Sequence, residues 1–124
     1  MSLDASARKS KDLGSAHSGV GHFLHQRISA MFLIPLSIWF GICVLGLVGA
    51  NEPSVLIFLQ NPLNALLMGA FVLISLFHMT LGLEEVINDY VPHEGAKLFL
   101  ILLTRGFALA VASGCVFALL RIAI

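Results

Sequence analysis

A histidine, an aspartate and a tyrosine along one apolar segment are the residues best suited to chemistry in this sequence. His78 lies within the uncharged run from Leu63 to Leu83, and Asp89 and Tyr90 follow at its polar end. At ~100° per residue, the interval from His78 to Asp89 is about 20° more than three helical turns. Both side chains therefore share one helix face. An ionisable group inside a membrane span is costly and by default marks a functional site.

The composition indicates one small integral membrane domain. Of 124 residues, 58% are hydrophobic and 11% are charged, which is too apolar for a soluble domain and too short for more than a few membrane spans. The net charge is zero, and no basic patch is interleaved with aromatic residues, so nothing favours a nucleic-acid partner. Cys43 and Cys115 lie in apolar runs without CxxC spacing, which is typical of packing residues. Any iron-sulfur cluster would belong to a partner.

Three long apolar runs predict an all-α integral membrane fold with three transmembrane helices, because a helix needs ~20 residues to cross the hydrocarbon. The asparagine-proline sequences between the first two runs predict a helix end, a short connector and a new helix start. A polar turn is expected over 88–95. The predicted parts are an N-terminal tail at 1–21 and a membrane-anchor domain at 22–124, with helices at about 28–50, 63–86 and 97–121.

The distribution of positive charge predicts the orientation of the spans. Arg8, Lys9, Lys11 and Arg27 precede or begin the first helix, the first loop carries no Lys or Arg, and Lys97 lies in the second loop. Because short cytoplasmic flanks carry an excess of Lys and Arg, we expect the N-terminus and the 88–95 turn to be cytoplasmic.

Two roles fit His78. At ~1.5 Å per residue it lies about 7 Å from the middle of its span. It is either a neutral packing histidine bonded to a neighbouring helix or an axial haem ligand, because a neutral imidazole is a common axial donor. Gly82, one turn further along, leaves room for a flat macrocycle and favours haem. No second histidine lies in an apolar span, so a six-coordinate haem would be shared with another chain.

Two roles also fit Asp89 and Tyr90, which lie ~17 Å beyond His78 along the helix. A tyrosine hydroxyl that donates to a carbonyl, beside a carboxylate that relays a proton, suits an amphipathic quinone. The alternative is an aromatic belt residue next to a helix-end carboxylate.

The remaining charged residues near the spans receive simpler interpretations. Arg27 either grips a carboxylate, such as a haem propionate, bidentately or anchors the first span. Glu84 and Glu85 are expected to be solvated helix-end charges, with Glu85 on the His78 face and available to a partner. Arg105 is expected to extend to the cytoplasmic surface rather than to bind an acidic partner within the bundle. The roles of His22 and His25 stay open.

Several short motifs, spread over nearly the whole chain, carry a family resemblance. They are Gly14-Ser15-Ala16, His22-Phe23, Gln26-Arg27-Ile28-Ser29-Ala30, Pro35-Leu36, His78-Met79-Thr80-Leu81-Gly82 and Asn88-Asp89-Tyr90-Val91. With these motifs and the three-helix plan, the sequence closely resembles the smaller hydrophobic membrane-anchor subunit of succinate dehydrogenase, respiratory complex II, especially its alphaproteobacterial forms.

This resemblance implies roles for four residues. His78 would be an axial ligand of haem b, with the opposite ligand supplied by the larger cytochrome b anchor subunit. Tyr90 would hydrogen-bond ubiquinone, with Asp89 contributing to the same site. Arg27 would lie near the haem propionates.

The resemblance also implies partners and a location. FAD and iron-sulfur clusters would be held only by the flavoprotein and iron-sulfur subunits, so this chain would not oxidise succinate alone. It would be a multi-pass protein of the bacterial inner membrane, rather than of the mitochondrial inner membrane. Two alternatives stay open at this point: the anchor of a quinol:fumarate reductase, and a three-helix membrane scaffold without redox chemistry.

Overall fold

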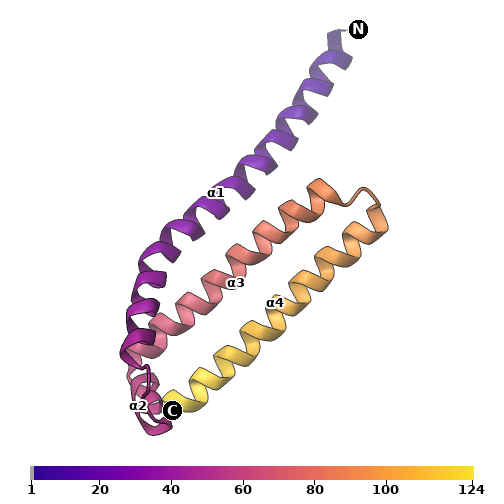
Figure 1. The fold of residues 1–124 in the computed structure, drawn as a ribbon. Helices are drawn as coiled ribbons and strands as arrows, with labels where there is room; N and C mark the ends of the chain where they lie inside the picture. The colour runs from indigo at the N-terminus through magenta and orange to yellow at the C-terminus, as the bar shows by residue number, and fades with distance from the viewer. Residues whose placement is uncertain (1) are drawn as a thin grey trace.

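The computed structural model describes the backbone of residues 2–124 and the side chains of residues 19–124. Within these residues the chain is helical and contains no strand (Figure 1). The helices are α1 (Ser2–Gly46), α2 (Glu52–Gln60), α3 (Pro62–Tyr90) and α4 (Glu94–Ala123). Residues 19–46 of α1, and the whole of α3 and α4, are long and apolar enough to cross a membrane. The predicted all-α class with three spans is therefore confirmed.

The predicted connector between the first two spans is itself a short helix, α2. Asn51 caps its N-terminus by accepting a hydrogen bond from Ser54 N at 3.1 Å, and Pro53 occupies the first turn. These are standard helix-start features. At 1.5 Å per residue the nine residues of α2 cover about 14 Å, which is well short of a ~30 Å hydrocarbon core. The helix before it ends at Gly46 instead of near residue 50.

The third helix runs further than the sequence indicated. Asn61 caps its start, with its side chain accepting from the Leu63 and Asn64 backbone N–H groups at 3.0 and 3.4 Å. The helix continues to Tyr90, and Val91 is extended because it precedes Pro92. The predicted polar turn over 88–95 is therefore mostly wrong, since residues 88–90 form the last turn of α3 and α4 begins at Glu94.

The predicted N-terminal tail, residues 1–21, is continuous with α1 from Ser2 onward. Its cationic side chains, Arg8, Lys9 and Lys11, lie outside the described side chains. The orientation that was inferred partly from them stays a prediction.

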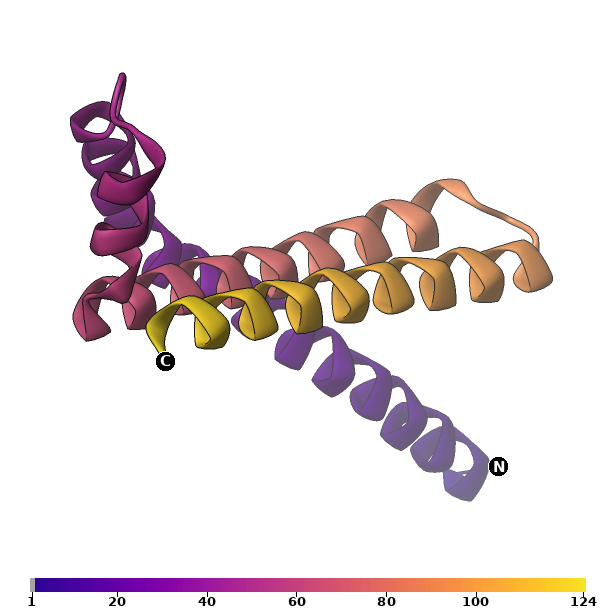
Figure 2. The same cartoon turned by 90° about the horizontal axis from the view of Figure 1, so that it is seen from below.

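Helix α3 is the centre of the arrangement. It contacts α1, α2 and α4, and the two ribbon views show α3 and α4 side by side and antiparallel, with α1 crossing α3 on its other side (Figures 1 and 2). A stacked pair, Phe40 and Phe71, with ring centroids 4.7 Å apart, joins α1 to α3. We call the end of the bundle that carries the α3–α4 connection, residues 91–93, the turn end.

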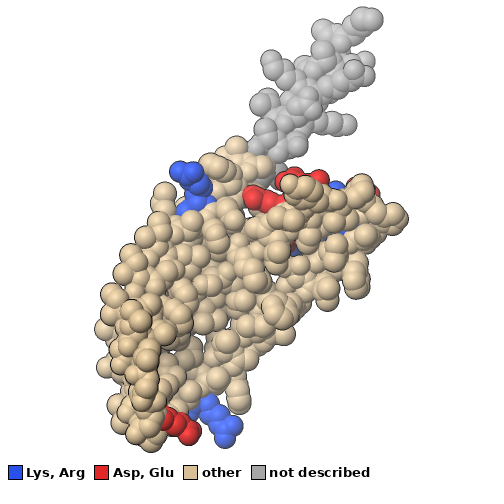
Figure 3. Space-filling view, viewed as in Figure 1, with Lys and Arg blue, Asp and Glu red and all other residues tan. Residues whose placement is uncertain are grey.

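The chain buries almost none of its apolar surface by itself. Among the described side chains, Ile87 is the only buried hydrophobic residue, whereas large apolar side chains such as Phe23, Leu45 and Phe107 are mostly exposed. Figure 3 shows an uncharged surface across the middle of the molecule, with acidic and basic side chains at its two ends. Such a surface is suited to lipid and to further transmembrane helices.

Candidate functional site

His78 is half-buried on the face of α3 that packs against α1. Its Nδ1 lies 2.8 Å from the hydroxyl oxygen of Ser29. Ser29 is only 5% exposed, and its hydroxyl donates to the Gln26 carbonyl oxygen at 2.9 Å. His78 is therefore bonded to a neighbouring helix through one ring nitrogen. No described side chain forms a hydrogen bond with the other nitrogen, Nε2, so the packing role does not exclude a ligand role.

An open apolar groove adjoins this contact, between α1 and α3. It has a volume of about 270 Å³, and Ser29 and Phe77 contribute to its wall. His25 also lines the groove and meets the Phe77 ring edge to face, with centroids 6.1 Å apart. The groove is thus mostly apolar and borders the Ser29 side of the contact, whereas His78 itself does not line it.

Gly82 faces Gln26 of α1. A Cβ atom added to Gly82 would lie 3.4 Å from Nε2 of Gln26, which is ordinary van der Waals contact. The space beside Gly82 is therefore bordered by α1, and the expectation that Gly82 makes room for a macrocycle stays a prediction.

At the turn end, His22 and Glu85 join α1 to α3. His22 Nδ1 lies 3.1 Å from Glu85 Oε1, and their side chains are 30% and 50% exposed. Glu85 was expected on the His78 face and available to a partner, and in this structure it contacts α1 of the same chain. Because both groups are partly solvated, the pair is worth little as a salt bridge; it joins the middle of α1 to the last turns of α3.

Arg27 is exposed on α1, with its guanidinium 5.5 Å from the centre of the Phe23 ring. It has no acidic partner among the described side chains. Ser29 is only two residues further along, so Arg27 lies at nearly the same depth as His78, but about 200° around the helix from Ser29. The structure therefore brings Arg27 to the depth of His78 without bringing the two side chains together.

Asp89 and Tyr90 end α3 at the turn end, and both are exposed, Tyr90 by 80%. Neither forms a hydrogen bond or ion pair with another described side chain. At 1.5 Å per residue Tyr90 lies about 18 Å from His78 along the helix axis. The four predicted residues therefore belong to two places: His78 and Arg27 at one depth, Asp89 and Tyr90 at the turn end.

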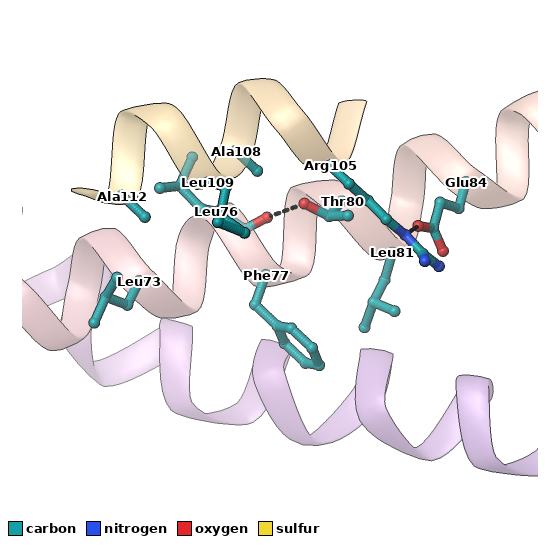
Figure 4. A pocket seen from close by; sticks show the side chains of 10 residues that line it. All are labelled: Leu73, Leu76, Phe77, Thr80, Leu81, Glu84, Arg105, Ala108, Leu109 and Ala112. Carbon is teal, nitrogen blue, oxygen red and sulfur yellow. Dashed lines mark hydrogen bonds and ion pairs between the residues drawn. The ribbon is translucent and has the colours of Figure 1, made fainter. Parts of the chain in front are cut away.

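Glu84 and Arg105 form a pair that the sequence analysis misjudged. Glu84 is only 8% exposed, and Arg105 Nε donates to its Oε1 at 2.5 Å (Figure 4). Glu84 is thus not a solvated helix-end charge, and Arg105 binds an acidic side chain of the same bundle while its own side chain stays 61% exposed. The physical reason is that a buried carboxylate away from water requires a charged hydrogen-bond partner, and α4 places Arg105 beside it.

This pair stands at one end of a cleft between α3 and α4, drawn in Figure 4. The cleft has a volume of about 420 Å³ and is otherwise lined mainly by leucine and alanine side chains. Thr80, the other polar residue of its wall, donates its hydroxyl proton to the Leu76 carbonyl oxygen in its own helix, at 2.7 Å.

No group of three or more His, Cys, Asp and Glu side chains arranged to hold a metal ion occurs among the described residues. Cys43 and Cys115 are both half-buried and form no disulfide.

Residues 5–120 match the family model described as succinate dehydrogenase/fumarate reductase transmembrane subunit. The chain belongs to this family. The resemblance inferred from the motifs is thereby confirmed. Because that match covers most of the chain, all three membrane-spanning helices are family elements.

Curated relatives carry a narrower name, succinate dehydrogenase hydrophobic membrane anchor subunit. The protein from Rickettsia bellii is 33% identical over 82% of this chain and 81% of its own length. That from Rickettsia conorii is 32% identical over 90% of this chain and 89% of its own. That from Paracoccus denitrificans is 31% identical, over 92% and 88%. No solved structure gives a significant match to this chain.

Proposed function

We propose that this chain is the membrane-anchor subunit of a succinate:quinone oxidoreductase, that it shares a b-type haem with a second anchor chain, and that it forms part of the ubiquinone site. The observation that carries the proposal is His78, an imidazole inside an apolar span of a family member, hydrogen-bonded to Ser29 through Nδ1 and without a hydrogen-bond partner at Nε2 among the described side chains. A histidine with one ring nitrogen hydrogen-bonded to a neighbouring group is the usual arrangement of a metal-ligating histidine.

His78 would hold the haem iron through its imidazole, together with a ligand from the larger anchor subunit. When bound, the haem supplies one-electron transfer within the membrane. Arg27 would bind a propionate; its depth beside Ser29, its exposure and its lack of an acidic partner among the described side chains support this role. A guanidinium is suited to this because it donates two parallel hydrogen bonds to a carboxylate.

Tyr90 and Asp89 form this chain's share of the quinone site. Reduction of a quinone to a quinol takes two electrons and two protons, so the head group must meet a proton source while its tail stays in lipid. The exposed Tyr90 hydroxyl donates to a quinone carbonyl at the membrane surface, and Asp89 beside it relays protons from water. Neither residue forms a hydrogen bond or an ion pair with another described side chain, so both are available to substrate and to partner chains.

Succinate oxidation takes place elsewhere in the complex. A flavoprotein subunit with FAD removes two electrons and two protons from succinate, and an iron-sulfur subunit carries the electrons to the quinone. This chain holds neither group and does not oxidise succinate by itself. The exposed apolar faces of its three spans are where the larger anchor subunit packs.

The complex resides in the bacterial inner membrane, with the N-terminus and the turn end on the cytoplasmic side. Lys97, in the first turn of α4 at the turn end, and Arg27, which precedes the apolar run of α1, support this orientation through the excess of positive charge on cytoplasmic flanks. The family description also covers fumarate reductase, whose net reaction runs in reverse. The names of the curated relatives favour the succinate dehydrogenase direction.

Affinity purification of the tagged chain from gently solubilised membranes tests this function. We expect a flavoprotein, an iron-sulfur subunit and a second hydrophobic chain in equal amounts, together with succinate-dependent ubiquinone reduction. A particle that lacks the flavoprotein and iron-sulfur subunits would favour the scaffold alternative. A particle that oxidises quinol with fumarate but does not reduce ubiquinone with succinate would favour the fumarate reductase alternative.

A further inference from the structure

Ser29 and Glu84 are the only buried polar side chains among the described residues. Glu84 is explained by Arg105, whereas Ser29 has no charge to neutralise. It is enclosed between α1 and α3, and its hydroxyl oxygen touches two polar atoms: the Gln26 carbonyl oxygen at 2.9 Å and His78 Nδ1 at 2.8 Å. A serine in this position therefore connects the backbone of one spanning helix to the imidazole of another.

The number of protons available decides the direction of these two hydrogen bonds. A serine hydroxyl has a single proton, and a carbonyl oxygen can only accept. If the hydroxyl donates to Gln26, then the contact with His78 requires a proton on Nδ1, donated to the Ser29 oxygen. In the opposite tautomer the proton is on Nε2, so Nδ1 can only accept. The Ser29 hydroxyl would then donate to Nδ1, and its contact with the Gln26 carbonyl oxygen would have no hydrogen bond. Only protonated Nδ1 satisfies both contacts.

In a neutral imidazole with its proton on Nδ1, the other nitrogen, Nε2, carries the lone pair. This is the nitrogen without a hydrogen-bond partner among the described side chains. The Ser29 contact also restricts rotation of the ring, because the Nδ1–H must stay directed at one oxygen atom that is itself fixed to α1.

We propose that Ser29 is a positioning residue for the haem site: it fixes the tautomer and the ring plane of His78, so that Nε2 is presented to the iron. The inference rests on the proposed function of His78. Outer hydrogen bonds of this kind also raise the basicity of the ligand. A more basic imidazole stabilises ferric over ferrous iron, so the Ser29 contact lowers the reduction potential of the haem.

The test is Ser29→Ala in the assembled complex, compared with wild type and with Ser37→Ala. Ser37 is the matched control because it lies on α1, two turns further along, and is exposed. Three quantities are measured: haem per complex after exposure to excess apomyoglobin, the midpoint potential by redox titration, and the electron paramagnetic resonance spectrum of the ferric haem, which reports the orientation of the axial ring planes.

We expect Ser29→Ala to weaken haem retention ~10-fold or more, to raise the midpoint potential and to change the resonance g-values, with Ser37→Ala unchanged in all three. If Ser29→Ala lowers haem content but the remaining haem keeps its wild-type potential and g-values, Ser29 serves packing only and the proposal is overturned. Unchanged values in all three measurements overturn it as well. Absence of haem from the wild-type complex would instead reject the proposed function, and the role of Ser29 with it.

Discussion

The Glu84–Arg105 pair provides the sharpest test of the packing between α3 and α4. Replacing Arg105 by Gln leaves a carboxylate that is 10% exposed without its charged partner. Breaking a fully buried pair costs about 3–5 kcal/mol, whereas an exposed pair is worth about 0–1 kcal/mol. Because the Arg105 side chain is 61% exposed, we expect an intermediate coupling, about 1–3 kcal/mol.

The experiment is a double-mutant cycle on the purified complex, with Arg105→Gln, Glu84→Gln and the double variant. The measured quantity is the rate of irreversible thermal inactivation at one fixed temperature. A coupling of about 1–3 kcal/mol means that the inactivation rate of the double variant differs ~5- to 150-fold from the rate obtained by multiplying the two single-variant effects. Arg105→Gln is expected to be the most damaging change, because Glu84 cannot reach water, whereas Arg105 released by Glu84→Gln can.

The double variant should inactivate more slowly than Arg105→Gln, because two neutral amides replace an unpaired buried charge. A matched control is Arg121→Gln, which removes the charge near the end of the same helix and should change the rate little. If the rate of the double variant lies within about twofold of the product of the two single effects, equivalent to ~0.5 kcal/mol, the two residues do not interact and the buried pair is refuted.

Two further predictions concern the turn end. Tyr90→Phe should lower succinate:ubiquinone reductase activity at least ~10-fold while leaving succinate oxidation by an artificial dye intact, because only the quinone loses a hydrogen-bond donor. Glu94→Gln is the control. Equal loss of both activities would indicate failed assembly instead. His22→Ala and Glu85→Ala should each cost less than ~1 kcal/mol, with no additional effect when combined, as measured by thermal inactivation; a loss above ~3 kcal/mol would contradict a partly solvated pair.

The membrane-spanning helices were predictable because length and apolarity alone define them. The run after Ile28 and the run after Leu63 each cover the hydrocarbon without a charge, so no tertiary information is needed. The same cue failed for α2, whose nine residues are mostly apolar but too few to span the hydrocarbon. Its capping asparagine and following proline were visible in the sequence, and read together they would have indicated a helix start at Asn51.

The helix ends were predicted less accurately because polar residues and helix-breaking residues give conflicting signals there. The polar residues Asn88 and Asp89 suggested a turn, but no residue before Pro92 breaks a helix, so α3 continues to Tyr90. This matters for function, since a helical Tyr90 has a fixed direction at the end of α3, whereas a residue in a loop would not.

Contacts between helices could not be predicted from one sequence. Arg105 could extend to the surface or bind an acidic side chain, and only the register of α3 against α4 brings Glu84 next to it. Ser29 belonged to the motif over 26–30 but gave no signal of its own role, since a serine in an apolar helix is common and its role depends on α1 lying against His78. The cost of an unpaired ion in the membrane was the one available cue, and it favoured the paired arrangement for Arg105.

The most direct test of the central claim is the reduced-minus-oxidised spectrum of the purified complex with His78→Gln. Glutamine retains an amide that can bond to Ser29 but has no imidazole nitrogen for iron, and His25→Gln, in the neighbouring groove, is the matched control. We expect the b-type haem bands in the wild type and His25→Gln and their loss in His78→Gln, with all subunits still present. An unchanged spectrum in His78→Gln would contradict the assignment of His78 as the axial ligand.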